Sequence, residues 1–384
     1  MAENTLTGLI PDIYEALDVV SRELTGLIPA VTVAASSERA AKDEAIKIDI
    51  APTITGVDIT PAMVVPDPTG LTSGTSSVTI TKERAAPFGF NGNDQKGLNN
   101  GPGYLSHRAG KIAQAIRTIT NEVEVDLAAL QSTFSRAYGT SGTTPFGTAN
   151  DYTDASNVLR ILKDNGAPGS DNHLVIDTAS GANFIGKQSA VNSAGTDSML
   201  RQGVLLDLAG MPLRESAQIV TNTAGTGASA TTDNAGYAIS ATTITLASAG
   251  TGSILAGDLI TFAGDTNKYQ VTTGDADVSG GGTVVLAAPG LRVAIAASTT
   301  AITVVAAAAR NMCFNRSALV LAARAPARPE EGDMAEDSMI ITDPRSGISL
   351  EFAMYKGYRK VRYEVALAWG VANIKPEHTA LLLG

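Results

Sequence analysis

The residues able to perform acid–base or metal chemistry are few and widely spaced in this sequence. The three histidines, His107, His173 and His378, have no cysteine or acidic cluster beside them at the spacing of a metal site. We therefore expect each to be a surface residue or a hydrogen-bonded core residue. The single cysteine, Cys313, lies between a methionine and a phenylalanine, which is typical of a small core residue rather than a nucleophile.

Motifs for nucleotide binding and hydrolysis are also missing from the sequence, which holds no GxSxG, Walker A or GxGxxG pattern. Asp275 and Asp277 follow a glycine as in a calcium loop, but the remaining ligands of such a loop are absent, so a turn is the better interpretation. We predict no catalytic residue, metal or cofactor, and a protein that is not an enzyme. A triad built from distant residues would leave no such pattern, so this support for a structural role is weak.

Composition indicates a folded protein that repels nucleic acid. The chain has 384 residues, of which 44% are hydrophobic and 17% charged, and a formal net charge of −10. This balance excludes a disordered chain. A nucleic-acid reader usually presents a basic face to the phosphates. Contact with DNA should therefore be weak and non-specific, which suits a container better than a reader.

The start of the chain lacks the features of an export signal. It carries acidic residues where a signal peptide has basic ones, and the sequence has no run of about 18 apolar residues that would span a membrane. A lone cysteine implies no oxidising compartment. We expect a protein made and folded in a bacterial cytoplasm.

The N-terminal half begins with an arm and an extended loop. Residues 1–42 carry one short amphipathic helix whose polar face includes Asp12, Glu15 and Asp18. These carboxylates form either an ordinary solvated face or a docking site for a basic partner. Residues 43–106 contain strand-like stretches around a Pro-, Gly- and Thr-rich span that is too long for a compact connection. We predict an extended β-hairpin that needs a neighbouring molecule to cover it.

A long helix and an α/β segment follow. Apolar residues recur every three or four positions over 107–138, which predicts one helix with a single apolar stripe. We assign 107–150 to this helix and its surroundings. Residues 151–222 alternate helix and strand signals, with a helix expected over 153–165 and a buried strand over 173–177.

The composition changes sharply at about residue 223. Residues 223–310 are rich in Thr, Ala, Gly and Ser, and contain short strand-like runs separated by glycine-rich turns. We predict an antiparallel β-barrel inserted into an α/β domain that resumes at 311–335. Residues 336–384 are expected to form a hairpin and a long strand with one buried and one wet face.

This order of elements resembles the HK97-like capsid fold of tailed bacteriophages, in particular the P22-type coat proteins with an inserted β domain. Four stretches carry the resemblance, and the loop within 43–106 departs from it. They are TLTGLIPDIYEALDVVSREL at 5–24, TTITLASAGTGSILAGDLITFAG at 242–264, SALVLAARAPARPEEGDM at 317–334 and YEVALAWGVANIKPEHTALLLG at 363–384.

The resemblance implies an α+β major capsid protein that assembles with itself as pentamers and hexamers into an icosahedral shell around double-stranded DNA. It implies an N-terminal arm, an E-loop within 43–106, a spine helix in a peripheral domain, and an axial domain split between 151–222 and 311–335. The inserted domain would lie on the outside of the shell. The implied partners are further coat subunits, a scaffolding protein and a portal protein, and the implied location is the virion.

Three other functions fit parts of the pattern. An encapsulin-like nanocompartment shares the fold class, but the inserted β domain argues against it. An extracellular adhesin or polysaccharide-degrading enzyme would need a signal peptide and an acidic or aromatic cluster, which we do not find. A tail-tube or decoration protein fits the long helix poorly.

If the acidic face docks a basic scaffolding segment, replacing Asp12, Glu15 and Asp18 together by Ala weakens scaffold-dependent assembly at low salt. Salt screens such attraction, so the difference from wild type should shrink as ionic strength rises. Light scattering of mixtures with the scaffolding protein measures it. Normal low-salt assembly of the triple variant rules this docking out.

Overall fold

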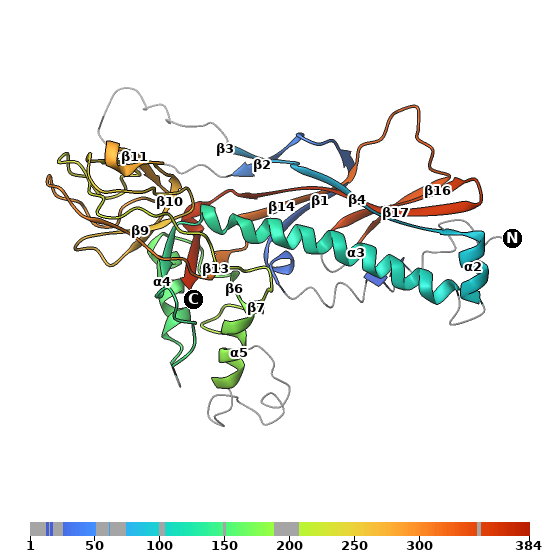
Figure 1. Cartoon of the computed structure of the whole chain (residues 1–384), viewed down its shortest axis with the longest axis horizontal. Coiled ribbons are helices and arrows are strands. Elements are labelled where there is room, and N and C mark those ends of the chain that lie inside the picture. The colour runs from blue at the N-terminus through green and yellow to red at the C-terminus, as the bar shows by residue number, and fades with distance from the viewer. Residues whose placement is uncertain are drawn as a thin grey trace.

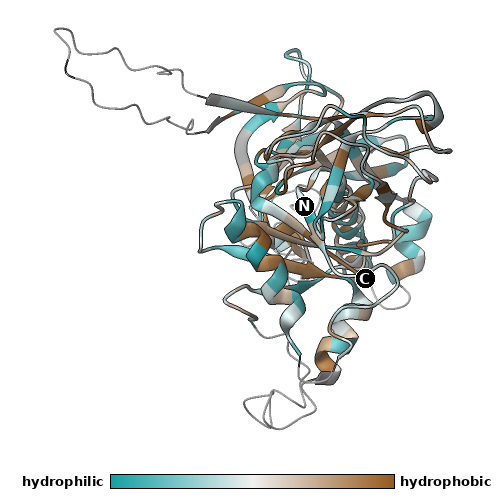
Figure 2. Cartoon of the chain, turned by 90° about the vertical axis from the view of Figure 1, so that its left-hand side faces the viewer, coloured by the Kyte–Doolittle hydropathy of each residue, from teal (hydrophilic) through white to brown (hydrophobic). Residues whose placement is uncertain are grey.

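The computed structural model combines helices and strands in an elongated α+β molecule, as predicted from the sequence (Figure 1). It describes residues 13–14, 16–17, 26–50, 61, 74–99, 104–148, 151–187, 207–343 and 347–384. Figure 2 shows hydrophobic segments along the strands of the body. No helix within these ranges is long and apolar enough to cross a membrane.

The described elements form two large sheets, a hairpin and four helices. The helices are α2 (Gly92–Asn99), α3 (Tyr104–Ala129), α4 (Thr153–Asp164) and α5 (Thr178–Lys187). The first sheet holds β1 (Thr32–Ala40), β4 (Lys82–Asn91), β14 (Leu319–Pro326), β15 (Asp337–Thr342), β16 (Ser349–Gly357) and β17 (Lys360–Asn373). The second holds β5 (Arg136–Tyr138), β6 (Asn172–Ile176), β7 (Leu213–Glu215), β8 (Thr243–Leu246), β9 (Leu259–Phe262), β10 (Lys268–Thr273), β11 (Gly282–Leu286), β12 (Ile302–Val304), β13 (Arg310–Asn315) and β18 (Thr379–Leu383). The hairpin joins β2 (Ala45–Ile50) to β3 (Gly74–Thr79).

The long helix α3 packs its predicted apolar stripe against the first sheet. The stripe faces β4 and β17, and its buried members are Ile112, Ile116, Ile119, Val123 and Leu127. Burial of such a stripe, rather than helix propensity, stabilises a helix of this length.

The prediction that the helix continues to residue 138 is wrong. The helix ends at Ala129, a 3₁₀ turn covers Leu130–Thr133, and the chain becomes extended at Phe134. Phe134 is still fully buried, so it follows the apolar period of the stripe without being helical. Arg136–Tyr138 instead pair with β10 and β18, and these hydrogen bonds override the helical periodicity.

The C-terminal hairpin and long strand form as predicted. β15 pairs antiparallel with β16, and β16 with β17. The turn between β15 and β16 includes residues 344–346, which lie outside the described part of the chain. The expected wet face exists only near the start of β17, because residues 365–370 are buried on both faces.

Strand β1 departs from the sequence-based expectation for residues 1–42, which is an arm with one short helix. It pairs in parallel with β14 at one edge of the first sheet. Its sequence, TVAASSERA, is small and polar and lacks the alternation of a half-buried strand, so no local pattern marks it. The pairing partner lies almost 290 positions away, which places this element beyond local prediction.

The root of the β2–β3 hairpin packs on the side of β14 and β17 that faces away from α3. Val78 and Ile80 are fully buried there against Val320, Ala322 and Ala368. A side chain at Gly370 would collide with the backbone of residues 79 and 80, so the contact requires glycine. The predicted hairpin is thus present at its base, whereas the connection at 51–60 and 62–73 lies outside the described residues.

The second sheet is built from distant segments. Its central strands β5, β18, β13 and β6 come from four separate segments of the chain, and α4 packs across β18. The helix and strand predicted at 153–165 and 173–177 are α4 and β6, shifted by at most one residue. The core on this side includes Leu162, Leu174 and Phe184.

Residues 223–310 have a core of their own but are joined to the second sheet. The sequence predicts strands here at 242–246, 259–262, 268–272, 283–286, 292–295 and 301–305. All but one are present as β8 to β12, whereas 292–295 contribute only one isolated bridge from Ile295 to Tyr237. Their side chains enclose a separate core that includes Ile244, Ile260 and Val271. β10 also pairs with β5, so the sheet continues into the body. The closed barrel stays a prediction.

Two glycine replacements test the packing of the hairpin root. Gly370→Ala should lower the free energy of unfolding by about 2 kcal/mol, because the new methyl group overlaps backbone atoms. Gly110→Ala is the matched control: nothing lies within 4 Å of a Cβ there, and the change should stabilise α3 by up to about 1 kcal/mol. Chemical denaturation measures both. Equal effects of the two variants contradict the close approach.

Candidate assembly surfaces

The side chains considered for chemistry occupy structural positions. His173 is buried and lies 3.0 Å from the Asp171 carboxylate, and burial lowers its pKa. Cys313 is fully buried, as predicted, and burial raises its pKa. Asp277 caps a short 3₁₀ turn and Asp275 accepts from the Asp277 amide, which confirms the predicted turn. Within the described ranges no three His, Cys, Asp or Glu residues converge as a metal site.

The acidic residues singled out as a docking face, Asp12, Glu15 and Asp18, all lie outside the described residues. On the same segment, Ile13 and Leu17 are buried in the main core. Docking of a basic segment on these carboxylates therefore stays a prediction.

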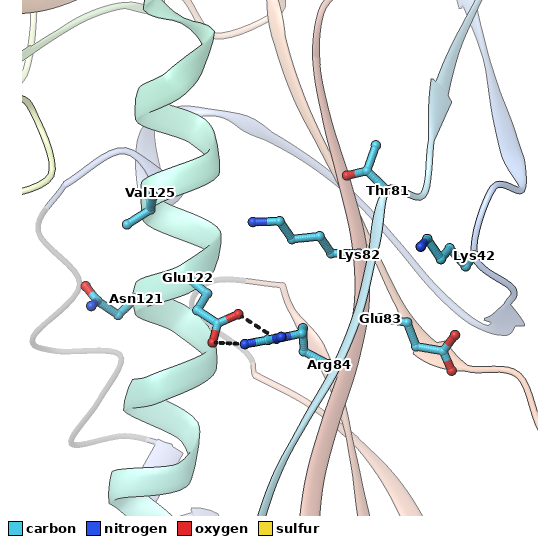
Figure 3. A pocket seen from close by; sticks show the side chains of 8 residues that line it. All are labelled: Lys42, Thr81, Lys82, Glu83, Arg84, Asn121, Glu122 and Val125. Carbon is cyan, nitrogen blue, oxygen red and sulfur yellow. Dashed lines mark hydrogen bonds and ion pairs between the residues drawn. The ribbon is translucent and has the colours of Figure 1, made fainter. Parts of the chain in front are cut away.

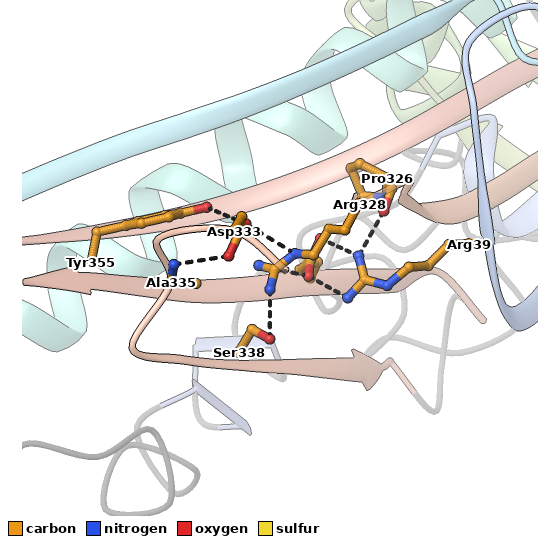
Figure 4. Close-up of polar contacts among 8 residues, drawn as sticks. Arg39, Pro326, Arg328, Asp333, Ala335, Ser338 and Tyr355 are labelled. Carbon is orange, nitrogen blue, oxygen red and sulfur yellow. Dashed lines mark hydrogen bonds and ion pairs between the residues drawn. The ribbon is translucent and has the colours of Figure 1, made fainter. Parts of the chain in front are cut away.

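A buried carboxylate, Glu351 on β16, fastens two distant segments to the first sheet (Figure 4). Arg39 on β1 donates to both of its oxygens, at 2.6 and 2.9 Å. Arg328, from the loop between β14 and β15, lies 3.0 Å from one of them. The hydrogen bond to Glu351 raises the pKa of Arg39, and the two-pronged geometry is the strong form of such a pair.

The same cluster shapes the loop at residues 327–336. Arg328 also donates to Ser338 and lies 3.4 Å from Asp333, so the ends of the loop are tied together. Asp333 accepts from the Ala335 amide at 2.8 Å and from the Tyr355 hydroxyl at 3.4 Å (Figure 4). The loop is therefore held in one conformation although much of its surface is solvated.

Ion pairs across a groove tie α3 to β4 (Figure 3). Asp126 accepts from Lys82 at 2.6 Å and from the indole of the fully buried Trp369 at 2.8 Å. One turn earlier, Arg84 donates two hydrogen bonds to Glu122. The groove has a volume of about 560 Å³. Since both walls are charged, it suits a polar segment better than an apolar ligand.

A second buried carboxylate, Glu124 on α3, clasps the returning N-terminal chain. It accepts hydrogen bonds from the amides of Leu27 and Ile28 at 2.5 and 3.1 Å, and from the Ser216 hydroxyl at 3.0 Å. Burial raises its pKa, against the lowering effect of these three bonds. A side chain at Gly26 would strike the carboxylate, so glycine is needed there.

Polar side chains also join residues 223–310 to the second sheet. Arg136 on β5 donates to Asn267 and to Asn165, at 2.9 and 2.8 Å. Gln270 on β10 donates to the carbonyl oxygen of Ser132 at 3.3 Å, and Arg310 on β13 donates to the carbonyl oxygen of Gly257. These side chains are largely buried, so the junction is fixed in orientation rather than a free linker.

None of these hydrogen bonds and ion pairs between distant segments was predicted from the sequence. Glu124 and Asp126 lie in an ordinary amphipathic helix, and the partners of these two acids and of Glu351 are remote in sequence. An acidic residue within an otherwise apolar strand, as in SLEFAM around Glu351, was the one available signal.

Comparison with known proteins gives similarity in fold only. No protein-family model and no curated protein sequence matches the chain. Among solved structures it is similar to the capsid of cyanophage A-1(L), with 10% identity, a TM-score of 0.47 and coverage of 93% of this chain and 92% of that one. It is similar to the capsid of cyanophage P-SCSP1u with 10% identity, a TM-score of 0.47 and coverage of 92% and 86%. A virus-like particle from Pyrococcus furiosus gives 10% identity, a TM-score of 0.41 and coverage of 96% and 97%.

Glu351→Gln should lower the free energy of unfolding by about 3 kcal/mol, because it leaves two guanidinium groups without their shared anion. Glu336→Gln is the matched control, since its pair with Lys356 is about half exposed and should contribute less than about 1 kcal/mol. Urea denaturation of both variants measures the difference. Similar losses in the two would show that the Glu351 cluster is no stronger than a surface pair.

Proposed function

We propose that this chain is the major capsid protein of a tailed bacteriophage, with an HK97-like fold. One observation carries the proposal. The 26-residue helix α3 packs on β4 and β17 of the first sheet, and it follows the β2–β3 hairpin, β4 and α2 in the chain and precedes the strands of the second sheet. This is the order of elements that the sequence resemblance implies, and Figure 1 supports it with an elongated shape rather than a rounded one.

In this proposal each part has a place in a shell. The first sheet with α3, the spine helix, is the peripheral domain. The axial domain consists of α4, α5 and the strands of the second sheet other than β8 to β12. The β2–β3 hairpin is the root of the E-loop, which lies on a neighbouring subunit. Residues 223–310 form the inserted β domain on the outer surface.

The proposed assembly has several contacts per subunit. Subunits form pentamers and hexamers, which demands interfaces that tolerate two local symmetries. Permanent interfaces of this kind bury on the order of 2,000 Å² or more in total. Spread over an arm, a hairpin and two domains, each contact is weak enough for a misplaced subunit to leave.

The proposed partners follow from charge and from the resemblance. A net charge of −10 supports a container whose wall lets double-stranded DNA slide, with only weak non-specific contact. A scaffolding protein and a portal protein complete the proposed procapsid. Assembly takes place in the bacterial cytoplasm, and the mature protein belongs to the virion.

Electron microscopy of the overexpressed chain, alone and with its scaffolding protein, tests the proposal. We expect hollow shells or rings of five or six subunits. Shells that carry a packaged enzyme instead of DNA would favour an encapsulin-like nanocompartment. A monomer that does not associate at any concentration rules out both.

A hairpin variant separates folding from assembly. Ile50 and Gly74 are paired in the β2–β3 hairpin, so an Asn-Gly turn placed between them closes it without residues 51–73. We expect a monomer with native helix content by circular dichroism that forms no shells. Normal shells from this variant would show that residues 51–73 have no role in assembly.

A further inference from the structure

Two large hydrophobic side chains are exposed far more than is usual. Met334 and Tyr358 are each 88% exposed, the highest values among the large hydrophobic residues that the structure describes. Met334 lies in the loop at residues 327–336, and Tyr358 in the turn between β16 and β17. Both project from the same domain, and neither contributes its apolar surface to the core.

The turn at Tyr358 has a sequence that the fold does not require. Gly357 and Lys360 are paired, which leaves Tyr358 and Arg359 as a two-residue connection. Arg359 has a φ of 56°, a conformation in which Asn or Gly is favoured in such turns. Its guanidinium group lies 5.6 Å from the centre of the Tyr358 ring. A strained arginine beside a solvated tyrosine points to a use outside the folded monomer.

A groove of about 770 Å³ lies between this turn and α2. Phe90 and Val361 contribute apolar lining, and Lys356, Arg359 and Lys360 contribute positive charge. None of the described residues that line the groove is acidic. Lys356 is paired with Glu336, but Arg359 and Lys360 have no ion pair within the described chain. The groove therefore suits an apolar side chain flanked by carboxylates.

The loop at residues 327–336 has this chemistry. Asp333 is turned inward to Arg328, while Met334 points to solvent. Glu330 and Glu331 are exposed and have no cationic partner among the residues that the structure describes. The Gly332 amide donates to the Pro329 carbonyl at 3.0 Å, so the loop is a preformed turn. Preformed surfaces lose little entropy on binding.

We propose that the 327–336 loop of one copy of this chain binds the groove beside the β16–β17 turn of a second copy. Met334 enters between Phe90 and Tyr358, and Glu330 and Glu331 face Arg359 and Lys360. Within one copy Glu336 of the loop pairs with Lys356 of the groove at 2.8 Å while Met334 points to solvent, so the methionine that enters the groove comes from a second copy. Since the two surfaces differ, the contact is head-to-tail and propagates into rings. The inference rests on the proposed shell function and adds the residues of one contact.

Cross-linking of single-cysteine variants tests this contact. Met334→Cys protein is mixed with Tyr358→Cys protein and treated with a short bismaleimide. We expect a covalent dimer, because the two residues meet across the contact, and little background, because Cys313 is fully buried. Val220→Cys in place of Tyr358→Cys is the control, since Val220 is 58% exposed but lies outside the contact. Equal yields with the two partners would overturn the proposal.

Charge exchange gives an independent result. Arg359→Glu with Lys360→Glu, or Glu330→Lys with Glu331→Lys, should each raise the concentration needed for association by about tenfold or more, because like charges then meet. Mixing the two variants, or combining all four changes in one chain, should restore association. Sedimentation velocity measures the sizes, with circular dichroism as the check on folding.

The outcomes distinguish a failure of this contact from a failure of the proposed shell function. If wild type assembles and neither the charge variants nor the cysteine pair behaves as expected, this contact is wrong and the shell function stands. If wild type never associates, the proposed function fails and the contact fails with it. If a charge variant unfolds, the cysteine pair decides, because it alters only side chains that are already in solvent.

Discussion

The first sheet depends on β17, which is paired along both of its edges and covered on both of its faces. Its first part pairs with β16 and its last part with β14, while β4 follows its other edge. α3 covers one face, and the backbone of β3 approaches the other at Gly370. A strand enclosed in this way can have only one register, because a shift of one residue would move Trp369 out of the core.

Two buried carboxylates and one partly buried carboxylate then fix how the remaining segments attach to this sheet. Glu124 holds the N-terminal chain on α3, Asp126 joins α3 to β4 and β17, and Glu351 holds β1 and the 327–336 loop. A carboxylate removed from water is costly unless donors surround it, so each acid selects one arrangement of its partners. An acidic, lightly charged chain thus uses some of its few charges as ties between distant segments.

Three exposed surfaces carry side chains or backbone groups that the core does not use. The β2–β3 hairpin, the groove beside α2 and the 327–336 loop present exposed groups that the core does not use. The described parts of these surfaces are more rigid than a mobile surface loop, because ion pairs or tight turns hold them in place. Preformed contacts of this kind lower the entropy lost at an interface without making any one interface strong.

Local sequence patterns were enough to predict most of the strands in 223–310, the C-terminal hairpin, α4 and the body of α3. Those elements are encoded by apolar periodicity and by turn residues, which act over a few positions. Contacts between distant segments set where α3 ends, bring residues 32–40 into a sheet, and bury both faces of β17 beyond residue 365. They also decide which acids, Glu124 and Glu351 among them, become buried ties. Strand pairing and burial depend on residues hundreds of positions apart. The local periodicity of apolar residues does not indicate which distant segment is the partner.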